Sequence, residues 1–337
     1  MKRPSISVVL LRPLAAAFEG EPRALAALLS AADLTPQMLA DAEARVTPAQ
    51  FCVAWAEALR LSGDPALALR IAGATPPGAF GLVEYVCRCA PTLGASLGAW
   101  VRYLGVLDDA VEVGLVEAGP RVALRVIAES EAPAPASHEL CFALIVATAR
   151  RWTGEGFRAE VVRFRHAGSE ALRERHRAFF GSDVRFGERQ TEILFGRAAL
   201  DAPLPTADPN LLELLVPSAE EKRVARTRHL PLTDQVRRTL GAAPGDESAR
   251  VGAVARRLGL TARSLQRRLR DEGTTFAGVR EGLRQELAER YLAQGLSCAE
   301  ISFLLGFSEP SAFFRAFKRW TGVTPLERRS RLAAAAG

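Results

Sequence analysis

The sequence contains no apolar run long enough to cross a membrane. Near its start, the largely apolar residues 7–11 and 14–18 are separated by Arg12 and Pro13, whereas a membrane-spanning helix needs about 20 consecutive apolar residues. The same Arg–Pro pair interrupts what would be the apolar region of a signal peptide. We therefore expect a protein that is neither anchored in a membrane nor exported.

Cysteine is too scarce and too irregularly spaced for a disulfide framework. The odd number of cysteines suits a reducing cytoplasm, where we place the protein. The five cysteines are Cys52, Cys87, Cys89, Cys141 and Cys298. Cys87 and Cys89, with His138 and Cys141, are candidate metal ligands. A Cys-x-Cys spacing is not usual for structural zinc, however, and buried cysteines are common on apolar helices, so we expect no metal site.

Motifs for enzyme chemistry are lacking as well. The sequence has neither a Walker motif nor a dinucleotide-binding glycine motif, and no Ser, His and Asp set ordered as a catalytic triad. His166 ends a predicted strand among basic residues, where an ordinary surface or capping histidine is the simpler interpretation. We expect no catalytic residue and no cofactor.

Lysine is nearly absent, so arginine carries most of the positive charge, which is concentrated toward the C-terminus. Residues 1–221 contain 22 Lys and Arg against 27 Asp and Glu, a net charge of −5, whereas residues 222–337 contain 22 against 11, a net charge of +11. A compact domain with this excess attracts polyanions, most commonly the phosphate backbone of nucleic acid. Unfolded basic tails do the same, so charge alone leaves DNA binding undecided.

The first two thirds of the chain predict an α+β domain. Residues 24–109 show the apolar spacing of successive short helices, with prolines placed where first turns would begin. Around Gly119 and Pro120 the period changes to two, which predicts a β-hairpin. The elements expected after it are helices at 138–153 and 170–180 and strands at 160–166, 184–186 and 192–195. This order predicts helices with a small antiparallel sheet, followed by an all-α domain with two helix-turn-helix motifs.

A change in composition marks the junction between the two domains. Residues 201–217 contain four prolines, and residues 218–229 are polar and charged. Clusters of this kind are typical of connecting segments. We therefore predict a first domain at 1–215, a linker at 216–229 and a second domain at 230–332.

A helix-turn-helix pattern in the second domain predicts DNA binding. The apolar residues of 251–258 share one helical face, Gly259 supplies a sharp turn, and Thr261 is an N-cap for the next helix. That helix buries Leu265 and Leu269. Its polar residues on other faces are Arg263, Gln266, Arg267 and Arg270. Such a helix fits a major groove, where Gln pairs with adenine and Arg with guanine.

The same pattern occurs a second time further along the chain. Ser297 and Glu300 form a capping box, Gly306 turns the chain, and a helix at 309–320 follows. Its residues available to DNA are Pro310, Ser311, Arg315 and Lys318. The alternative is a basic helical bundle whose arginines only meet solvent, but two similar glycine-turned helix pairs argue against it.

Residues 297–325, SCAEISFLLGFSEPSAFFRAFKRWTGVTP, closely resemble the signature of the AraC/XylS family of bacterial transcription regulators. The resemblance covers about residues 230–332. It implies that one monomer spans about two turns of DNA on a single face. The residues that it places in one major groove are Arg263, Gln266 and Arg267, and those in the next are Pro310, Ser311 and Arg315. Phe303 and Phe314 depart from the smaller or polar residues expected at their positions.

Residues 1 to about 215 resemble the arabinose-binding-like domain of one branch of that family, which implies a small-molecule effector without identifying it. Segments 80–82, 162–166 and 200–208 are among those that match. The candidate effector-binding residues are aromatic: Tyr85, Tyr103, Trp100 and Trp152. A phenol offers a polar group within an apolar cavity. For each residue, a purely structural role in the core is the alternative.

Together these features predict a cytoplasmic regulator that binds promoter DNA, with a small-molecule effector shifting its conformational equilibrium. A homodimer and contact with RNA polymerase are further expectations. Two other functions stay open at this point: an architectural DNA-binding protein without an effector, and an enzyme domain fused to a DNA-binding module.

Overall fold

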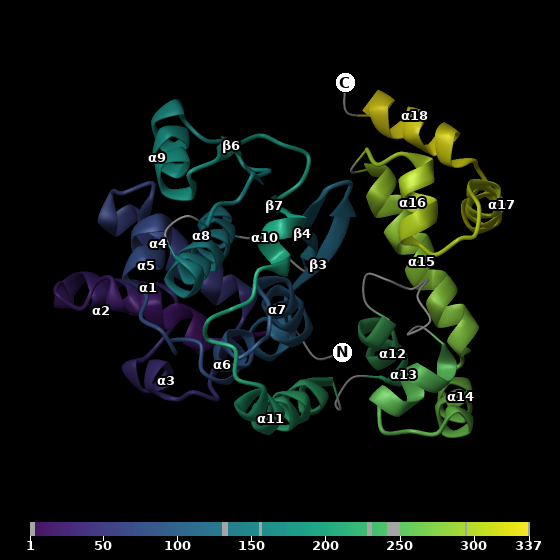
Figure 1. Ribbon diagram of the computed structural model, residues 1–337, viewed down its shortest axis with the longest axis horizontal. Coiled ribbons are helices and arrows are strands. Elements are labelled where there is room, and N and C mark those ends of the chain that lie inside the picture. The colour runs from purple at the N-terminus through teal and green to yellow at the C-terminus, as the bar shows by residue number, and fades with distance from the viewer. Residues whose placement is uncertain are drawn as a thin grey trace. The chain divides into compact units, whose positions relative to one another are not determined.

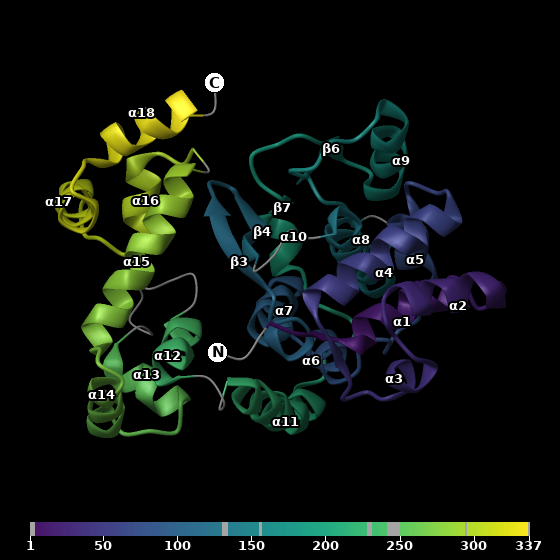
Figure 2. The ribbon, with the colours of Figure 1, turned by 180° about the vertical axis from the view of Figure 1, so that it is seen from behind.

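The computed structural model describes residues 4–129, 134–154, 157–227, 231–240, 250–293 and 295–335. The chain divides into two compact units, and the boundary between them falls between residues 226 and 227. This boundary lies inside the predicted linker. The course of the chain through each unit can be followed in Figures 1 and 2.

The N-terminal unit is built mainly of short helices. It opens with β1 (Ile6–Ser7), which pairs with β2 (Arg45–Val46), and with the 3-10 helix η1 (Val8–Leu11). Its helices are α1 (Arg12–Ala16), α2 (Pro22–Ala31), α3 (Pro36–Ala40), α4 (Pro48–Ser62), α5 (Leu67–Ala74), α6 (Leu82–Arg88), α7 (Leu93–Leu107), α8 (Pro135–Thr153), α9 (Glu170–Phe180), α10 (Arg197–Asp201) and α11 (Pro209–Thr227). As the sequence predicts, α2, α3 and α4 begin with proline, whose missing N–H costs nothing in a first turn.

A five-stranded sheet follows the first seven helices. Its strands are β3 (Val111–Ala118), β4 (Arg121–Glu129), β5 (Val161–Arg163), β6 (Asp183–Arg185) and β7 (Glu192–Gly196). They lie in the order β3-β4-β7-β5-β6, antiparallel except for the parallel pair β5–β6. Gly119, at a φ of +65°, makes the turn of the predicted β3–β4 hairpin. The α+β class predicted for this unit is confirmed.

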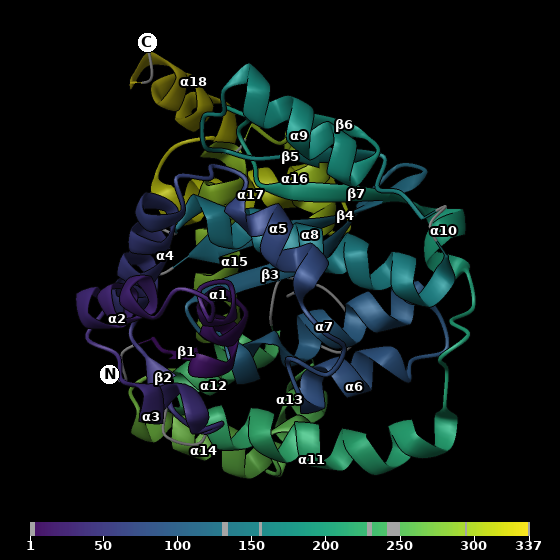
Figure 3. The ribbon, with the colours of Figure 1, turned by 90° about the vertical axis from the view of Figure 1, so that its left-hand side faces the viewer.

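One face of the sheet forms the main core with the helices. Val122 and Leu124 of β4 and Ile193 and Phe195 of β7 point to this face, where they join the buried side chains of α4, α5 and α8. Figure 3 shows α8 beside the sheet. On the opposite face, the buried Glu192 bonds to Arg125 at 2.7 Å. Alternation along each strand therefore separates an apolar face from a face that carries ion pairs.

A buried carboxylate joins two histidines inside this unit. Glu139 of α8, only 3% exposed, lies 2.7 Å from His166 Nε2 and 3.0 Å from His176 Nε2. His176 Nδ1 donates to the Leu172 carbonyl oxygen at 2.8 Å, so its bond to Glu139 needs a proton on Nε2 or on the carboxyl group. His166 is thus a core hydrogen-bonding residue, and the cluster ties α8 to α9 and to the segment after β5.

The predicted junction is largely helical in the structure. Helix α11 begins at Pro209, which is acceptable in a first turn, and continues through Pro217 to Thr227. Its Ala219 is fully buried against Val83, Val86 and Tyr103 of α6 and α7. The prolines of this segment suggested a connecting region, but α11 is a helix that packs in the N-terminal unit.

The C-terminal unit is all helical, as predicted. Its helices are α12 (Leu232–Leu240), α13 (Val251–Arg257), α14 (Ala262–Asp271), α15 (Phe276–Ala293), α16 (Cys298–Leu304), α17 (Pro310–Thr321) and α18 (Pro325–Ala335). Within this unit, α15 runs between two groups of helices, with α12, α13 and α14 at one end and α16, α17 and α18 at the other (Figure 1). Both predicted helix-turn-helix pairs are present, α13–α14 and α16–α17.

Local signals in the sequence determine both turns. Gly259 and Gly306 have φ values of +67° and +68°, a conformation that residues with a Cβ rarely adopt. Thr261 accepts a hydrogen bond from the Ser264 N–H at 3.1 Å. Ser297 and Glu300 form the expected reciprocal capping box. Helices α14 and α16 therefore start where their N-caps are placed.

We expect Glu139→Gln to lower the free energy of unfolding by about 3 kcal/mol, because breaking one side of a buried, hydrogen-bonded charge cluster leaves its partners uncompensated. Chemical denaturation of the full chain measures this loss. Glu174→Gln, at an exposed position of the neighbouring α9, is the matched control and should change stability little.

The same variant should alter the acid dependence of stability. Burial raises the pKa of Glu139, but hydrogen bonds from His166 and His176 outweigh it, so the pKa is lowered. A lowered carboxyl pKa adds stability above the unfolded value of about 4.3, and this stability is lost as the pH falls through the folded value. A Glu139→Gln variant with unchanged stability and an unchanged acid limb would contradict this account.

Candidate DNA interface and internal cavity

Helix α14 presents polar side chains outward from an apolar back. Leu265 and Leu269 are fully buried, and this burial determines which side chains of the helix remain outside. The four residues predicted to contact DNA on this helix are all exposed: Arg263, Gln266, Arg267 and Arg270. Between them they offer guanidinium and amide groups, which suit guanine and adenine edges respectively.

Helix α17 is built in the same way. Phe313, Ala316 and Phe317 face the core, and the predicted residues Pro310, Ser311, Arg315 and Lys318 are all exposed. Arg315 lies 3.3 Å from Glu309, which also accepts a hydrogen bond from Ser311. These two bonds lower the pKa of Glu309. Glu309 therefore holds two of the predicted DNA-contacting side chains together at the start of the helix.

The two helices lie near opposite ends of α15. In Figures 1 and 2, α17 lies beside one end of α15 and α14 lies beyond the other end, and both are seen close to end-on. The axes of the two helices are therefore seen in similar directions. This is the arrangement that two recognition helices need in order to contact neighbouring grooves.

Polar anchors hold both helices against the rest of the unit. The Glu272 carboxylate, just after α14, accepts hydrogen bonds from the Leu232 and Thr233 N–H groups of α12 at 2.6 and 2.8 Å. Glu281 of α15 accepts a bond from Trp320 Nε1 of α17 at 3.1 Å and also pairs with Arg319. Each recognition helix is thus tied to a neighbouring helix at a defined point.

Two aromatic residues singled out by the sequence differ in their surroundings. Phe303 of α16 is 75% exposed. Phe314 is half-buried, with its ring centroid 6.1 Å from that of Phe313. Phe314 therefore packs beside the core of the second helix pair, whereas Phe303 contributes little to that core.

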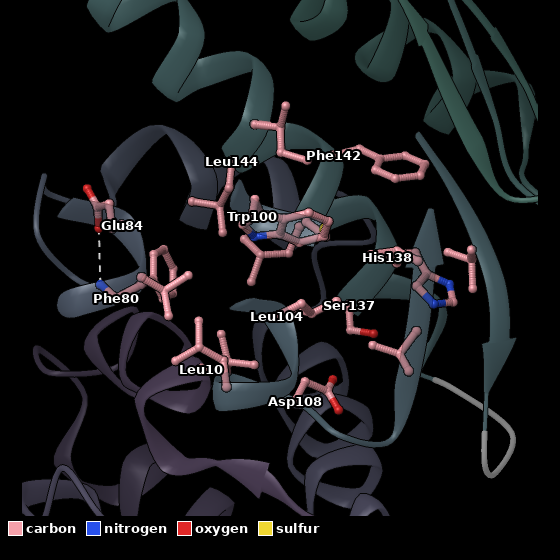
Figure 4. A pocket seen from close by; sticks show the side chains of 18 of the residues that line it. Leu10, Phe80, Glu84, Trp100, Leu104, Asp108, Ser137, His138, Phe142 and Leu144 are labelled. Atoms are coloured by element: carbon pink, nitrogen blue, oxygen red, sulfur yellow. Dashed lines mark hydrogen bonds between the residues drawn. The ribbon is translucent and has the colours of Figure 1, made fainter. Parts of the chain in front are cut away.

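An internal cavity of about 220 Å³ lies in the N-terminal unit. Its walls come from η1, α4, α6, α7, β3, β4 and α8, and most of them are apolar, among them Leu10, Leu104 and Leu144 (Figure 4). Trp100 and Trp152 line it as well. An apolar cavity of about 150 Å³ is large enough to bind benzene, so this one has room for a somewhat larger molecule.

Polar groups of the cavity lie at separate ends. Glu84 accepts hydrogen bonds from the Gly78 and Phe80 N–H groups at 2.7 and 3.1 Å. Figure 4 shows Asp108, Ser137 and His138 away from Glu84, with apolar side chains between them. His138 Nε2 lies 2.9 Å from Glu129. The polar groups are thus few and localised, as in binding sites where they orient an otherwise apolar ligand.

The four aromatic residues predicted to bind an effector fall into two pairs. Trp100 and Trp152 line the cavity, whereas Tyr85 and Tyr103 are not among its lining residues. Tyr85 is 42% exposed, and Tyr103 is 3% exposed and packs against α11. On α7, Trp100 and Leu104 share the face toward the cavity and Tyr103 lies on the face toward α11. Helical periodicity therefore separates residues that are neighbours in the sequence.

Sequence reasoning did not single out Asp108 or Ser137, and it weighed His138 only as a metal ligand. One local signal was present, because Asp108 follows the last residue of α7, where the helix dipole disfavours a carboxylate. Such local conflicts often mark functional positions. Ser137 carries no comparable signal. Among the described residues, no group of three or more His, Cys, Asp or Glu side chains could hold a metal ion.

Two thiols of the cavity wall are held in the protonated form. Burial raises the pKa of Cys87 to about 12, with a further contribution from Glu84. Burial likewise raises the pKa of Cys141 to about 12, and Asp108 adds to it. Because the thiolate is the nucleophile, these groups act as apolar wall atoms.

Comparison with known proteins identifies the type of both units. Residues 23–204 match the family model described as "Arabinose-binding domain of AraC transcription regulator, N-term", and residues 254–331 match one described as "Helix-turn-helix domain".

None of the helices described here is long and apolar enough to span a bilayer.

Full-length relatives share both parts of the chain. The ornithine utilization regulator of Pseudomonas aeruginosa is 30% identical over 306 residues, which cover 90% of each chain. The HTH-type transcriptional regulator VirS of Mycobacterium tuberculosis is 34% identical over 285 residues, 79% of each chain. The crystal structure of the transcriptional regulator CdpR from Pseudomonas aeruginosa aligns over 92% of this chain and 98% of that one, with a TM-score of 0.45 and 20% identity. The two relatives that are at least 30% identical are both named as regulators.

We expect Cys87 and Cys141 to resist alkylation in the native protein. At about pH 8, near the ordinary pKa of a thiol, both remain protonated in the fold, so iodoacetamide should label them far more slowly than in denaturant. Mass spectrometry of peptides taken over time measures the two rates. Equal rates of labelling in the native and unfolded protein would show that the fold does not raise the pKa of these thiols or shield them from the reagent.

Proposed function

This chain belongs to the AraC family of transcription regulators, and from that premise we propose how its two units work together. The C-terminal unit binds promoter DNA in the bacterial cytoplasm by placing α14 and α17 in successive major grooves. A small molecule in the cavity of the N-terminal unit alters that binding or its effect on transcription. Dimerisation and contact with RNA polymerase remain predictions from the family resemblance.

The observation that carries the DNA interface is the exposure of polar side chains on both α14 and α17. Arg263, Gln266 and Arg267 on α14, with Arg315 on α17, are the base-contacting residues of this proposal. Their side chains are exposed, and the apolar backs of both helices are buried. The excess of arginine in residues 222–337 supports the same assignment through long-range attraction to phosphate.

We propose that effector occupancy is transmitted through α6 and α7 to α11. Trp100 and Val83 line the cavity and also belong to the cluster in which Ala219 of α11 is buried. Arg102 of α7 pairs with Glu220 of α11. A ligand that moves these shared side chains therefore changes the packing of α11, the last helix before the boundary between the two units. Differential affinity for two such arrangements is what a population shift requires.

The charges of the side chains that line the cavity indicate which class of effector it can bind. The name of the Pseudomonas relative mentions ornithine, and an amino acid brings a carboxylate. No Arg or Lys side chain is among the described residues lining this cavity. We therefore propose an effector that differs from a free amino acid.

We expect Arg263→Ala and Arg315→Ala each to weaken binding to a captured promoter fragment by about tenfold or more, because each removes a contact to a base. Fragments captured from the genome of the source organism by the full-length protein provide the target. Fluorescence anisotropy then measures the affinity of each variant for it, and single base changes in the fragment locate the lost contact.

Arg319→Ala is the matched control for loss of one positive charge on α17. Arg319 pairs with Glu281 of α15, so its removal should cost less affinity and no base discrimination. If Arg263→Ala and Arg315→Ala bound the fragment no more weakly than Arg319→Ala, the proposed interface would be wrong.

A further inference from the structure

The lining of the cavity is acidic as well as apolar. Its carboxylates are Glu84, Asp108 and Glu129. The described lining residues include no Arg or Lys, and His138 is the single basic side chain among them. An anionic ligand would therefore enter a site that repels it, since Coulomb interactions are strong away from bulk water.

Two of the three carboxylates already have partners. Glu84 uses both oxygens to accept the N–H groups of Gly78 and Phe80, and Glu129 is paired with His138. Each of these carboxylates is therefore engaged by groups of the protein itself. Asp108 forms no ion pair with any of the described lining residues, and unlike Glu84 it lies at the same end of the cavity as Ser137 (Figure 4).

The surroundings of Asp108 leave its negative charge poorly compensated. Its carboxylate accepts the Ala110 N–H at 2.8 Å and a further backbone hydrogen bond from Val111. Arg45 acts on it through its charge, but Arg45 bonds to Ser5 and to the Val106 carbonyl oxygen, both at 2.8 Å, and pairs with Asp109 at 3.7 Å. Burial raises the pKa of Asp108 to about 6, and the neighbouring Asp109 adds to this. A ligand cation next to this carboxylate would offset the unfavourable free energy of burying its negative charge.

Ser137 supplies a second acceptor at the same end of the cavity. Its hydroxyl donates to the Ala134 carbonyl oxygen at 2.7 Å, so its oxygen lone pairs remain available to a donor. Figure 4 shows Ser137 and Asp108 on the same side of the cavity, beside the apolar wall formed by Leu104. One charged and one neutral acceptor next to an apolar wall suit a donor group attached to an apolar body.

We propose that the cavity binds a small amine whose apolar body packs against Trp100 and Leu104 and whose ammonium group donates to Asp108 and Ser137. This assignment rests on the proposed function, because it specifies the class of effector. The volume of about 220 Å³ admits an aromatic ring with a short side chain, by comparison with the ~150 Å³ that holds benzene. The same lining disfavours carboxylates and phosphates.

The test uses the intact protein and three probes of matched shape: 2-phenylethylamine, 2-phenylethanol and phenylacetate. Isothermal titration and thermal denaturation measure the affinity for each. We expect the amine to bind at least tenfold more tightly than the alcohol and phenylacetate to bind least, because the three differ mainly in the charge that meets Asp108. Equal binding of all three, preference for the acid, or failure of the amine to bind would each overturn the proposal.

Asp108→Asn should abolish the preference for the amine over the alcohol while keeping the hydrogen bond to Ala110. Asp41→Asn is the matched control, because Asp41 also follows a helix and accepts an N–H two residues later, from Glu43 at 2.9 Å, but is exposed. The control should retain the amine preference. An Asp108→Asn variant with an unchanged preference overturns the role of Asp108, and the probe series on the unmodified protein decides the ligand class even if that variant does not fold.

The result can be separated from the proposed function. Promoter binding by the same protein is measured independently, and the alcohol reports whether the cavity accepts an apolar body at all. If the alcohol binds and the amine gains nothing, the amine assignment fails while an effector cavity stands. If the protein binds promoter DNA but none of the three probes, the DNA-binding role is supported and the proposal that this cavity binds the effector fails.

Discussion

Burial of one face of two short helices is the constraint on which the DNA-binding unit depends. Helix α14 has 10 residues and α17 has 12, lengths at which an isolated helix is marginal in water. Both persist because Leu265, Leu269, Phe313 and Phe317 are removed from solvent. The same burial leaves the arginines of each helix outside. Stability and the exposure of the proposed DNA-contacting groups therefore have a common cause.

In the N-terminal unit, one set of side chains both lines the cavity and packs against α11. Trp100 and Val83 form part of the cavity wall and part of the cluster that holds α11. A close-packed interior transmits small displacements because few voids absorb them. In the proposed mechanism, these shared side chains give a bound effector a short physical route to α11.

Local rules explain what could be predicted from the sequence. Gly259, Thr261 and the Ser297–Glu300 pair act within a few residues, so both helix pairs and the exposed arginines were predictable. The cavity depends on helices distant in the sequence, and neither Asp108 nor Ser137 belongs to a recognisable motif. Tyr103 was a candidate because of its chemistry, whereas its place on α7 turns it toward α11. The prolines of residues 201–217 suggested a break in structure, although Pro209 begins a helix.

The protonated thiols of the cavity wall bear on how long a response to the proposed effector would last. Cys87 and Cys141 stay in the unreactive form because burial raises the pKa of each to about 12, so these two side chains do not capture a molecule in the cavity by a covalent bond. Occupancy then follows the free concentration outside and ends when the molecule dissociates. A regulator built in this way keeps no chemical memory of earlier exposure, and repeated signals meet the same receptor each time.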